Sequence, residues 1–192
     1  MKTLEVAHSI TQKQLEFINH QLIVDTINAA FQRAKIYKYP QKESDPNRIR
    51  LREELKKRLT ELRKKYTSEV TETEHCQNIE NLSNELTKTF EKRDFLGGDD
   101  KFRIGIAQKA LNLYLKYLWC LGVIKTPPHC PFDNVVIENL EDESVRNIKW
   151  TKMDSIDDYK KLVQASKKLA YKTGYKTIAE WELYIWQDHL NS

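Results

Sequence analysis

Apolar residues recur at helical spacing along most of the chain, and no stretch shows the strict alternation of apolar and polar residues that indicates a β-strand. Leu51, Leu55, Leu59 and Leu62, for example, form one narrow apolar seam. The pattern predicts an all-α fold of about seven helices. The expected segments are 11–37, 45–66, a third through 76–90 that ends at Gly97-Gly98, 104–121, 134–140, 155–174, and a last one from residue 177.

Capping signals support these helix starts. A helix begins well where a Ser, Thr, Asp or Asn side chain accepts a hydrogen bond from a backbone N–H of the first turn. Such residues stand at five of the expected starts, namely Thr11, Asp45 (followed by Pro46), Asp133, Ser155 and Thr177. Pro40 is the expected stop for the first helix, because proline cannot continue a helix interior.

The segment 104–121 is the most apolar of the predicted helices. Its apolar residues cover more than one face, so we expect a central helix that is buried on most sides. The length of 192 residues suits one domain over 1–192. Within it, residues 1–98 read as charged amphipathic helices, and residues 99–192 as a core part that carries a polar cluster of Lys, Asn, His and Asp.

Composition indicates a globular, soluble protein. The formal net charge is +4, which permits nucleic-acid binding without requiring it. The three cysteines form no CxxC pair, and His75-Cys76 lacks a second pair of ligands, so we expect no disulfide framework, metal site or cofactor. The N-terminus lacks an apolar leader, and no apolar run reaches 18 residues. We therefore expect a cytoplasmic protein that does not span a membrane.

The helix expected over 45–66 is strongly basic. Arg48, Arg52 and Lys56 are its candidate phosphate contacts, because cations repeated along a helix can neutralise backbone phosphates. The alternative is a solvated face that Glu and Lys or Arg side chains stabilise at i,i+4 spacing, through Glu53–Lys57, Glu54–Arg58 and Glu61–Lys65.

A polar line crosses the central helix. Lys109, Asn112 and Lys116 fall on nearly one face, and we expect this face to point toward the loop that holds His129 and Asp133. A lysine inside an apolar helix is costly unless its ammonium is paired or reaches water. Partly desolvated, Lys109 is a candidate amine nucleophile with Asp133 as its carboxylate partner. The alternative is a structural Lys–Asp bridge, with His129 as a loop anchor rather than a general base.

A resemblance adds to this interpretation. Gly105-Ile106-Ala107-Gln108-Lys109, followed by Pro131-Phe132-Asp133, is similar to the core of the helix-hairpin-helix DNA glycosylases, and the C-terminal helices resemble the closing pair of small 8-oxoguanine glycosylases. The resemblance implies a hairpin at Gly105–Ala107, a Schiff-base lysine at Lys109 and a catalytic aspartate at Asp133. Ala107 stands where the family has a second glycine, and no cysteine cluster for an iron–sulfur centre follows.

The chain is also similar to a group of uncharacterised bacterial all-helical proteins. The shared pattern implies one folded unit and supplies no activity. It covers Gln108, Lys109, Asn112, Lys116, Tyr117, His129, Pro131, Asp133 and Trp150.

Three hypotheses follow from the sequence. The first is a DNA-binding protein with a glycosylase- or lyase-like site at Lys109 and Asp133. The second is a non-catalytic helical module in which Gln108, Asn112, Lys116 and His129 join a structural polar network or line a ligand pocket. The third is an interaction domain whose charged helices meet a protein partner or a second copy of the chain.

Overall fold

The computed structural model describes residues 10–191, with side chains through residue 188, and confirms the all-α fold. This part of the chain forms eight α-helices and two short 3-10 helices, with no strand. The elements are α1 (Gln12–Phe31), α2 (Pro46–Leu62), η1 (Arg63–Thr67), α3 (Glu72–Phe90), α4 (Gly97–Asp100), α5 (Ile104–Cys120), α6 (Asn134–Glu138), η2 (Trp150–Lys152), α7 (Ile156–Lys172) and α8 (Ile178–Asn191). None of these helices is long and apolar enough to cross a membrane.

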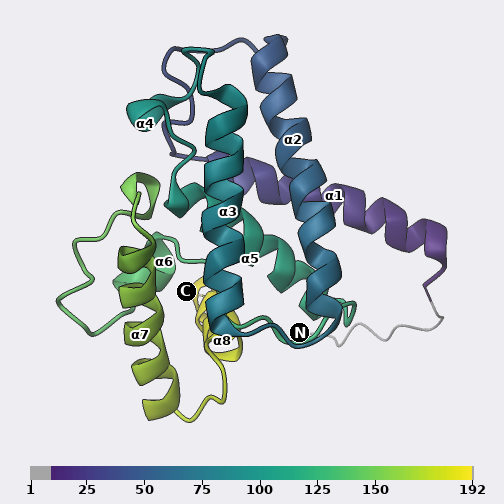
Figure 1. Ribbon diagram of the computed structural model, residues 1–192. Helices are drawn as coiled ribbons and strands as arrows, with labels where there is room; N and C mark the ends of the chain where they lie inside the picture. Colours follow the sequence, from purple (N-terminus) through teal and green to yellow (C-terminus); the bar gives the residue numbers. More distant parts are fainter. Residues whose placement is uncertain (1–9, 192) are drawn as a thin grey trace.

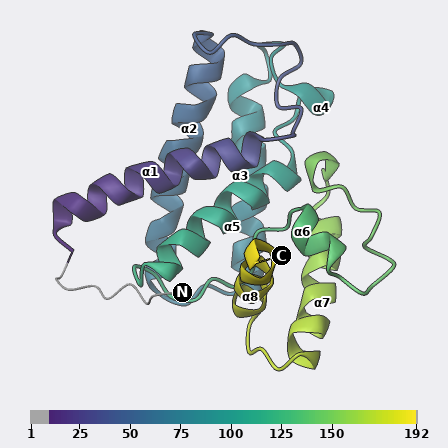
Figure 2. The ribbon, with the colours of Figure 1, turned by 180° about the vertical axis from the view of Figure 1, so that it is seen from behind.

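Helix α5 lies at the centre of the fold, as its apolar pattern predicts. Helices α1, α2, α3 and α7 all pack against it. Figure 1 shows α2 and α3 side by side, with α1 crossing behind them. Figure 2, seen from behind, shows α1 lying along α5, with α6, α7 and α8 gathered on the side of α5 away from α1. The central helix therefore touches elements from both halves of the sequence.

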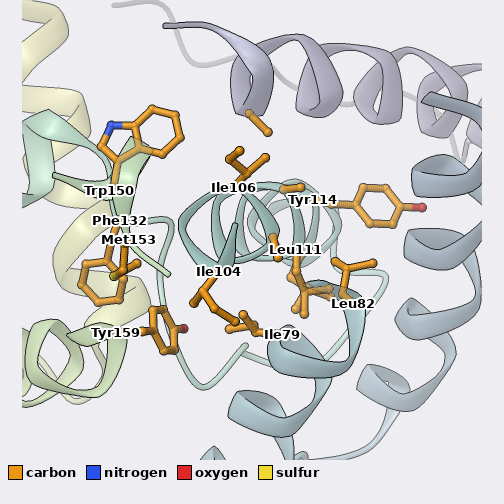
Figure 3. Packing of buried hydrophobic residues seen from close by; sticks show 14 of the residues in the cluster. Ile79, Leu82, Ile104, Ile106, Leu111, Tyr114, Phe132, Trp150, Met153 and Tyr159 are labelled. Carbon is orange, nitrogen blue, oxygen red and sulfur yellow. The ribbon is translucent and has the colours of Figure 1, made fainter. Parts of the chain in front are cut away.

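The hydrophobic core surrounds α5. Figure 3 views this helix nearly end-on, with Ile79 and Leu82 of α3 on one side and Phe132 and Trp150 on the other. All four side chains are buried. Burial of apolar surface is the main favourable contribution to folding, so this shell of side chains holds α5 and its polar residues in place.

The five expected capping residues all cap their helices. The side chains of Thr11, Asp45, Asp133, Ser155 and Thr177 each accept a hydrogen bond from a backbone N–H in the first turn.

The expected end of the first helix is wrong. Helix α1 ends at Phe31 rather than near Tyr37, and Arg33 follows with a positive φ of 62°. Tertiary contacts explain the early end. Ile36 is buried in the core, and Tyr37 forms an isolated β-bridge with Leu96. A helix continuing to residue 37 would lose these contacts, and no local sequence signal reports them.

The residues before α5 form an irregular turn, α4, in which Asp99 and Asp100 both adopt positive φ. Arg103 is the N-cap residue of α5, and its side chain makes no capping hydrogen bond. The sequence interpretation of the leader region, residues 1–9, lies outside the described residues.

Candidate functional site

The polar line on α5 divides between two faces of the helix. Successive residues are rotated by roughly 100°, so Lys109 and Lys116 nearly coincide in direction, whereas Gln108 is turned well away from them. Asn112 lies between these directions. In the structure Lys109 and Lys116 form ion pairs toward α6 and α8, and Gln108 and Asn112 bond into the core on the side of α3 and α7. Lys109 therefore reaches Asp133 as expected, whereas the expectation is wrong for Asn112, which turns toward α3 and α7, and for Lys116, which pairs with Glu182.

Lys109 and Asp133 form a close ion pair. The Lys109 Nζ lies 2.5 Å from Asp133 Oδ2, and the other carboxylate oxygen accepts a hydrogen bond from the backbone N–H of Val136 at 3.2 Å. The Lys109 side chain is 8% exposed and that of Asp133 is 30% exposed. One carboxylate thus caps α6 and neutralises the ammonium of α5.

A surface pocket of about 270 Å³ opens over this pair. Its aromatic lining comes from Tyr117, Trp150 and Trp186. Arg33 also lines the pocket; its side chain is exposed and has no ion pair among the described residues. The pocket therefore combines aromatic surface, an ion pair whose lysine is buried and whose carboxylate is partly exposed, and a free guanidinium.

The second lysine of this face is buried with a different partner. Lys116 Nζ contacts both carboxylate oxygens of Glu182 in α8, at 2.9 and 2.8 Å. It also lies 5.0 Å from the centre of the Trp186 ring, a cation–π distance. Burial raises the pKa of Glu182, although the nearby Lys116 ammonium opposes this shift. Lys116 therefore links α5 to α8 and contacts Trp186, one of the residues that line the pocket.

On the other face of α5, Gln108 and Asn112 enter a buried hydrogen-bond network. The Gln108 side chain donates to Phe132 O at 2.7 Å and accepts from Phe132 N at 3.1 Å. Asn112 donates to Gln108 Oε1 and to the Tyr159 hydroxyl, and its own Oδ1 lies 2.8 Å from His75 Nε2. Four segments, namely α3, α5, α7 and the loop before α6, are joined at this point.

The network assigns the protons of both histidines. Because the Asn112 oxygen must accept from His75 Nε2–H, the Nδ1 of His75 is free to accept from Tyr66 O–H at 2.7 Å. The Tyr159 hydroxyl accepts from Asn112 and so donates to His129 Nδ1 at 2.8 Å. His129 consequently carries its proton on Nε2.

Electrostatics agree with two neutral rings. Burial lowers the pKa of His75, and the neighbouring His129, 4.8 Å away between ring centres, adds to this shift. Burial also lowers the pKa of His129, outweighing the Glu72 carboxylate nearby. His129 does not lie against Asp133 and has no lone pair facing outward. It is a loop anchor with an N–H donor.

The three candidate phosphate contacts on α2 already have partners within the fold. Arg52 lies over the Phe31 ring and bonds Asn28, Arg48 lies over the Tyr37 ring, and Lys56 Nζ lies 3.2 Å from His20 Nδ1. Arg48 and Arg52 line a hollow that shares Ala29 and Gln32 with the Lys109 pocket.

Two of these arginines thus flank the same end of α1 as Arg33, whereas Lys56 lies farther along the helix pair, beside His20. Of the three expected i,i+4 ion pairs on α2, Glu54–Arg58 is present at 3.9 Å, and the described residues show no ion pair for the other two.

The expected hairpin at Gly105–Ala107 does not form. These residues lie in the first turn of α5 and are buried. The Gly105 N–H donates to Met153 O at 2.8 Å, and a Cβ at this position would lie 1.6 Å from Trp150 O. Glycine is therefore needed here for the close approach of η2, and its N–H is not available to a phosphate.

The sequence interpretation missed several residues of these two faces. His75 was considered only as a metal ligand beside Cys76, and no functional role was assigned to Tyr66, Tyr159, Glu72 or Glu182. His75 stands one turn before Ile79 on the apolar stripe of α3, and a polar residue on such a stripe signals a buried hydrogen-bond partner. Among the described residues no group of three or more His, Cys, Asp and Glu side chains is arranged to hold a metal ion.

Comparison with known proteins adds no relative. No protein-family model matches the chain, no curated protein shows significant similarity to it, and no solved structure matches its fold.

Proposed function

We propose that the chain binds nucleic acid and takes one unstacked nucleotide into the pocket over Lys109 and Asp133. The composition of the pocket carries this proposal. Trp186 and Tyr117 offer aromatic surface, the Lys109–Asp133 pair offers a donor and an acceptor, and the free Arg33 also lines the pocket. Bases stack on aromatic rings, and guanidinium groups bind phosphate through charge-assisted hydrogen bonds.

The surrounding charge supports this choice of ligand. Arg48 and Arg52 line the adjoining hollow, which shares Ala29 and Gln32 with the pocket, so three arginines lie near the same end of α1. The pocket volume of about 270 Å³ is near the lower end of the range for ligand sites, roughly 300–1,000 Å³. That volume suits one small planar group rather than a large ligand.

The same geometry supports a lyase-like reaction at an abasic site. Transfer of the Lys109 proton to Asp133, 2.5 Å away, would leave a neutral amine. This amine would add to the C1′ aldehyde of the open sugar and form an imine with loss of water. Loss of a C2′ proton would then expel the 3′ phosphate, so that Lys109 is the nucleophile and Asp133 the first base.

A non-catalytic module is the second candidate, and one observation favours it. Both oxygens of Asp133 are engaged, one with Lys109 and one with the N-terminus of α6. A carboxylate used in this way serves as a structural bridge. In that case Lys109 contributes to the shape of a binding pocket and forms no covalent intermediate.

Two measurements test the proposal. Fluorescence anisotropy with a single-stranded oligonucleotide measures binding, and we expect Arg33→Ala to weaken it about fivefold to tenfold, since one phosphate contact is lost. Arg50→Ala is the matched control, because Arg50 is an exposed arginine of α2 that lines neither hollow. Equal losses in the two variants, or no binding by the unaltered chain, would contradict the pocket as the binding site.

Borohydride reduction with abasic-site DNA tests the chemistry. The lyase reaction predicts a covalent adduct that Lys109→Gln abolishes and Lys101→Gln, a change at an exposed lysine, retains. Binding without any adduct would assign the pocket to the non-catalytic module.

A further inference from the structure

A second pocket, separate from the one over Lys109, lies between the start of α3 and α7. Its volume is about 290 Å³. Glu72 and His129 stand at its inner end, and Cys76, Ile156 and Val163 supply apolar wall. The remaining lining residues are polar, namely Thr73, Gln77, Glu80, Lys160 and Gln164.

The inner end of this pocket contains an unused hydrogen-bond donor. His129 is 1% exposed, and its Nε2 has no hydrogen-bond partner within the described part of the chain. The nearest carboxylate oxygen, Glu72 Oε2, lies 4.0 Å away, beyond hydrogen-bond distance. A buried polar group without a partner is costly, so an unpaired nitrogen that lines a pocket indicates a place for a ligand atom.

The position of the proton on the His129 ring decides whether the ligand atom must be a hydrogen-bond donor or an acceptor. Gln108 is oriented by the backbone of Phe132, Gln108 orients Asn112, and the Tyr159 hydroxyl then donates to His129 Nδ1. The open nitrogen therefore carries a proton and needs an acceptor. A metal ion, which needs a lone pair, does not fit it.

Glu72, beside this nitrogen, offers an acceptor rather than a donor. Glu72 pairs with Lys167 through Oε1, and its other oxygen, Oε2, faces His129 Nε2 and is available as an acceptor. A hydroxyl group meets both requirements at once, because it accepts from His129 Nε2–H and donates to Glu72. The Glu72 side chain is 47% exposed, so its carboxylate can move outward from its position 4.0 Å from the nitrogen and admit the hydroxyl between the two groups.

We propose that this pocket binds a neutral polyhydroxylated small molecule, a sugar or polyol, with one hydroxyl between His129 and Glu72. Charge balance favours a neutral ligand. Lys160 is the only cation among the lining residues and pairs with Asp157, and Lys167 pairs with Glu72, so no unpaired cation faces the pocket to hold an anion. Thr73, Gln77 and Gln164 offer donors and acceptors for further hydroxyls, and Ile156 and Val163 suit the C–H face of such a molecule.

Long-range 1H–15N correlation spectra of the imidazole rings test both the position of the proton on His129 and the binding of a ligand. Above neutral pH the His129 ring of the free chain should show the Nε2–H form; the opposite form would overturn the argument. Addition of myo-inositol should then shift the His129 signals in a saturable way in the millimolar range.

Glu72→Ala should weaken this binding at least about tenfold, and Glu80→Ala, which removes a carboxylate from the rim, less than about threefold. Saturation by inorganic phosphate or acetate instead of inositol would identify an anion site and overturn the proposal. No saturable shift with any of the three probes would also overturn it and assign the space to water.

Discussion

The two polar faces of α5 satisfy their groups in different ways. On the Asn112 face every link is buried, neutral and directional, and the orientation of each side chain depends on the next. The Lys109 face carries two ion pairs, Lys109–Asp133 and Lys116–Glu182, and the first of them borders an open pocket. Neutral networks of this kind hold one arrangement of the core, whereas a charged pair at a pocket can exchange its partner for a ligand.

This difference yields three predictions about stability, in order of expected size. Asn112→Ala should have the largest effect, a loss of about 3–5 kcal/mol in the free energy of unfolding. It leaves His75 Nε2–H without an acceptor and the Tyr159 hydroxyl without a donor, and it opens a cavity. Urea unfolding measures the loss. Asn81→Ala, at an exposed position of α3, is the control and should change stability by less than about 0.5 kcal/mol.

The second largest effect should come from acid, which lowers the free energy of unfolding through the two histidines of the Asn112 face. The pKa values of His75 and His129 are lowered by burial, so below about pH 6.5 the unfolded chain binds protons that the folded chain does not. Stability is therefore complete above this pH and falls by about 2–4 kcal/mol as the pH drops from 7 to 5.

Two carboxyl groups with altered pKa values, Glu182 and Glu72, also affect how stability changes with pH. The pKa of Glu182 is raised by burial, which opposes the loss because the folded chain takes up that proton first. The loss from Glu72 comes at more acid pH, below about 4.5. Chemical unfolding across this pH range measures the trend. Replacement of the exposed His20 by Gln should leave the profile unchanged, and a flat profile would contradict two neutral buried rings.

Lys109→Met should have the smallest effect, a loss of about 1–2 kcal/mol. The Asp133 carboxylate is 30% exposed and keeps its hydrogen bond from Val136 N, so water can solvate it once the ammonium is gone. The same measurement in the double variant Lys109→Met, Asp133→Asn should show recovery of part of the loss. A loss as large as that of Asn112→Ala would mean that stability depends as strongly on the Lys109 ion pair as on the buried neutral network.

Much of the fold follows from local sequence signals. The caps at Thr11, Asp45, Asp133, Ser155 and Thr177 act within a single turn, and the apolar pattern of 104–121 already indicates the central helix. The Lys109–Asp133 pair was one of the alternatives open from the sequence, because a lysine in an apolar helix needs a partner.

Other features depended on contacts between distant residues. Helix α1 ends at Phe31 because Ile36 and Tyr37 pack against the segment that includes Leu96. Lys116 finds its carboxylate 66 positions later, in α8. No local pattern reports either partner, since each is set by how the helices pack.

The amino-acid sequence by itself therefore determined most of the helices, five of their capping residues and the central place of α5, because capping and apolar periodicity act over a few residues. The tertiary structure decided which polar groups meet. It sent Lys109 and Asn112, three residues apart on α5, to different faces and different partners. It also set the proton on His129 through hydrogen bonds that begin at the backbone of Phe132, a consequence of packing four segments around one helix.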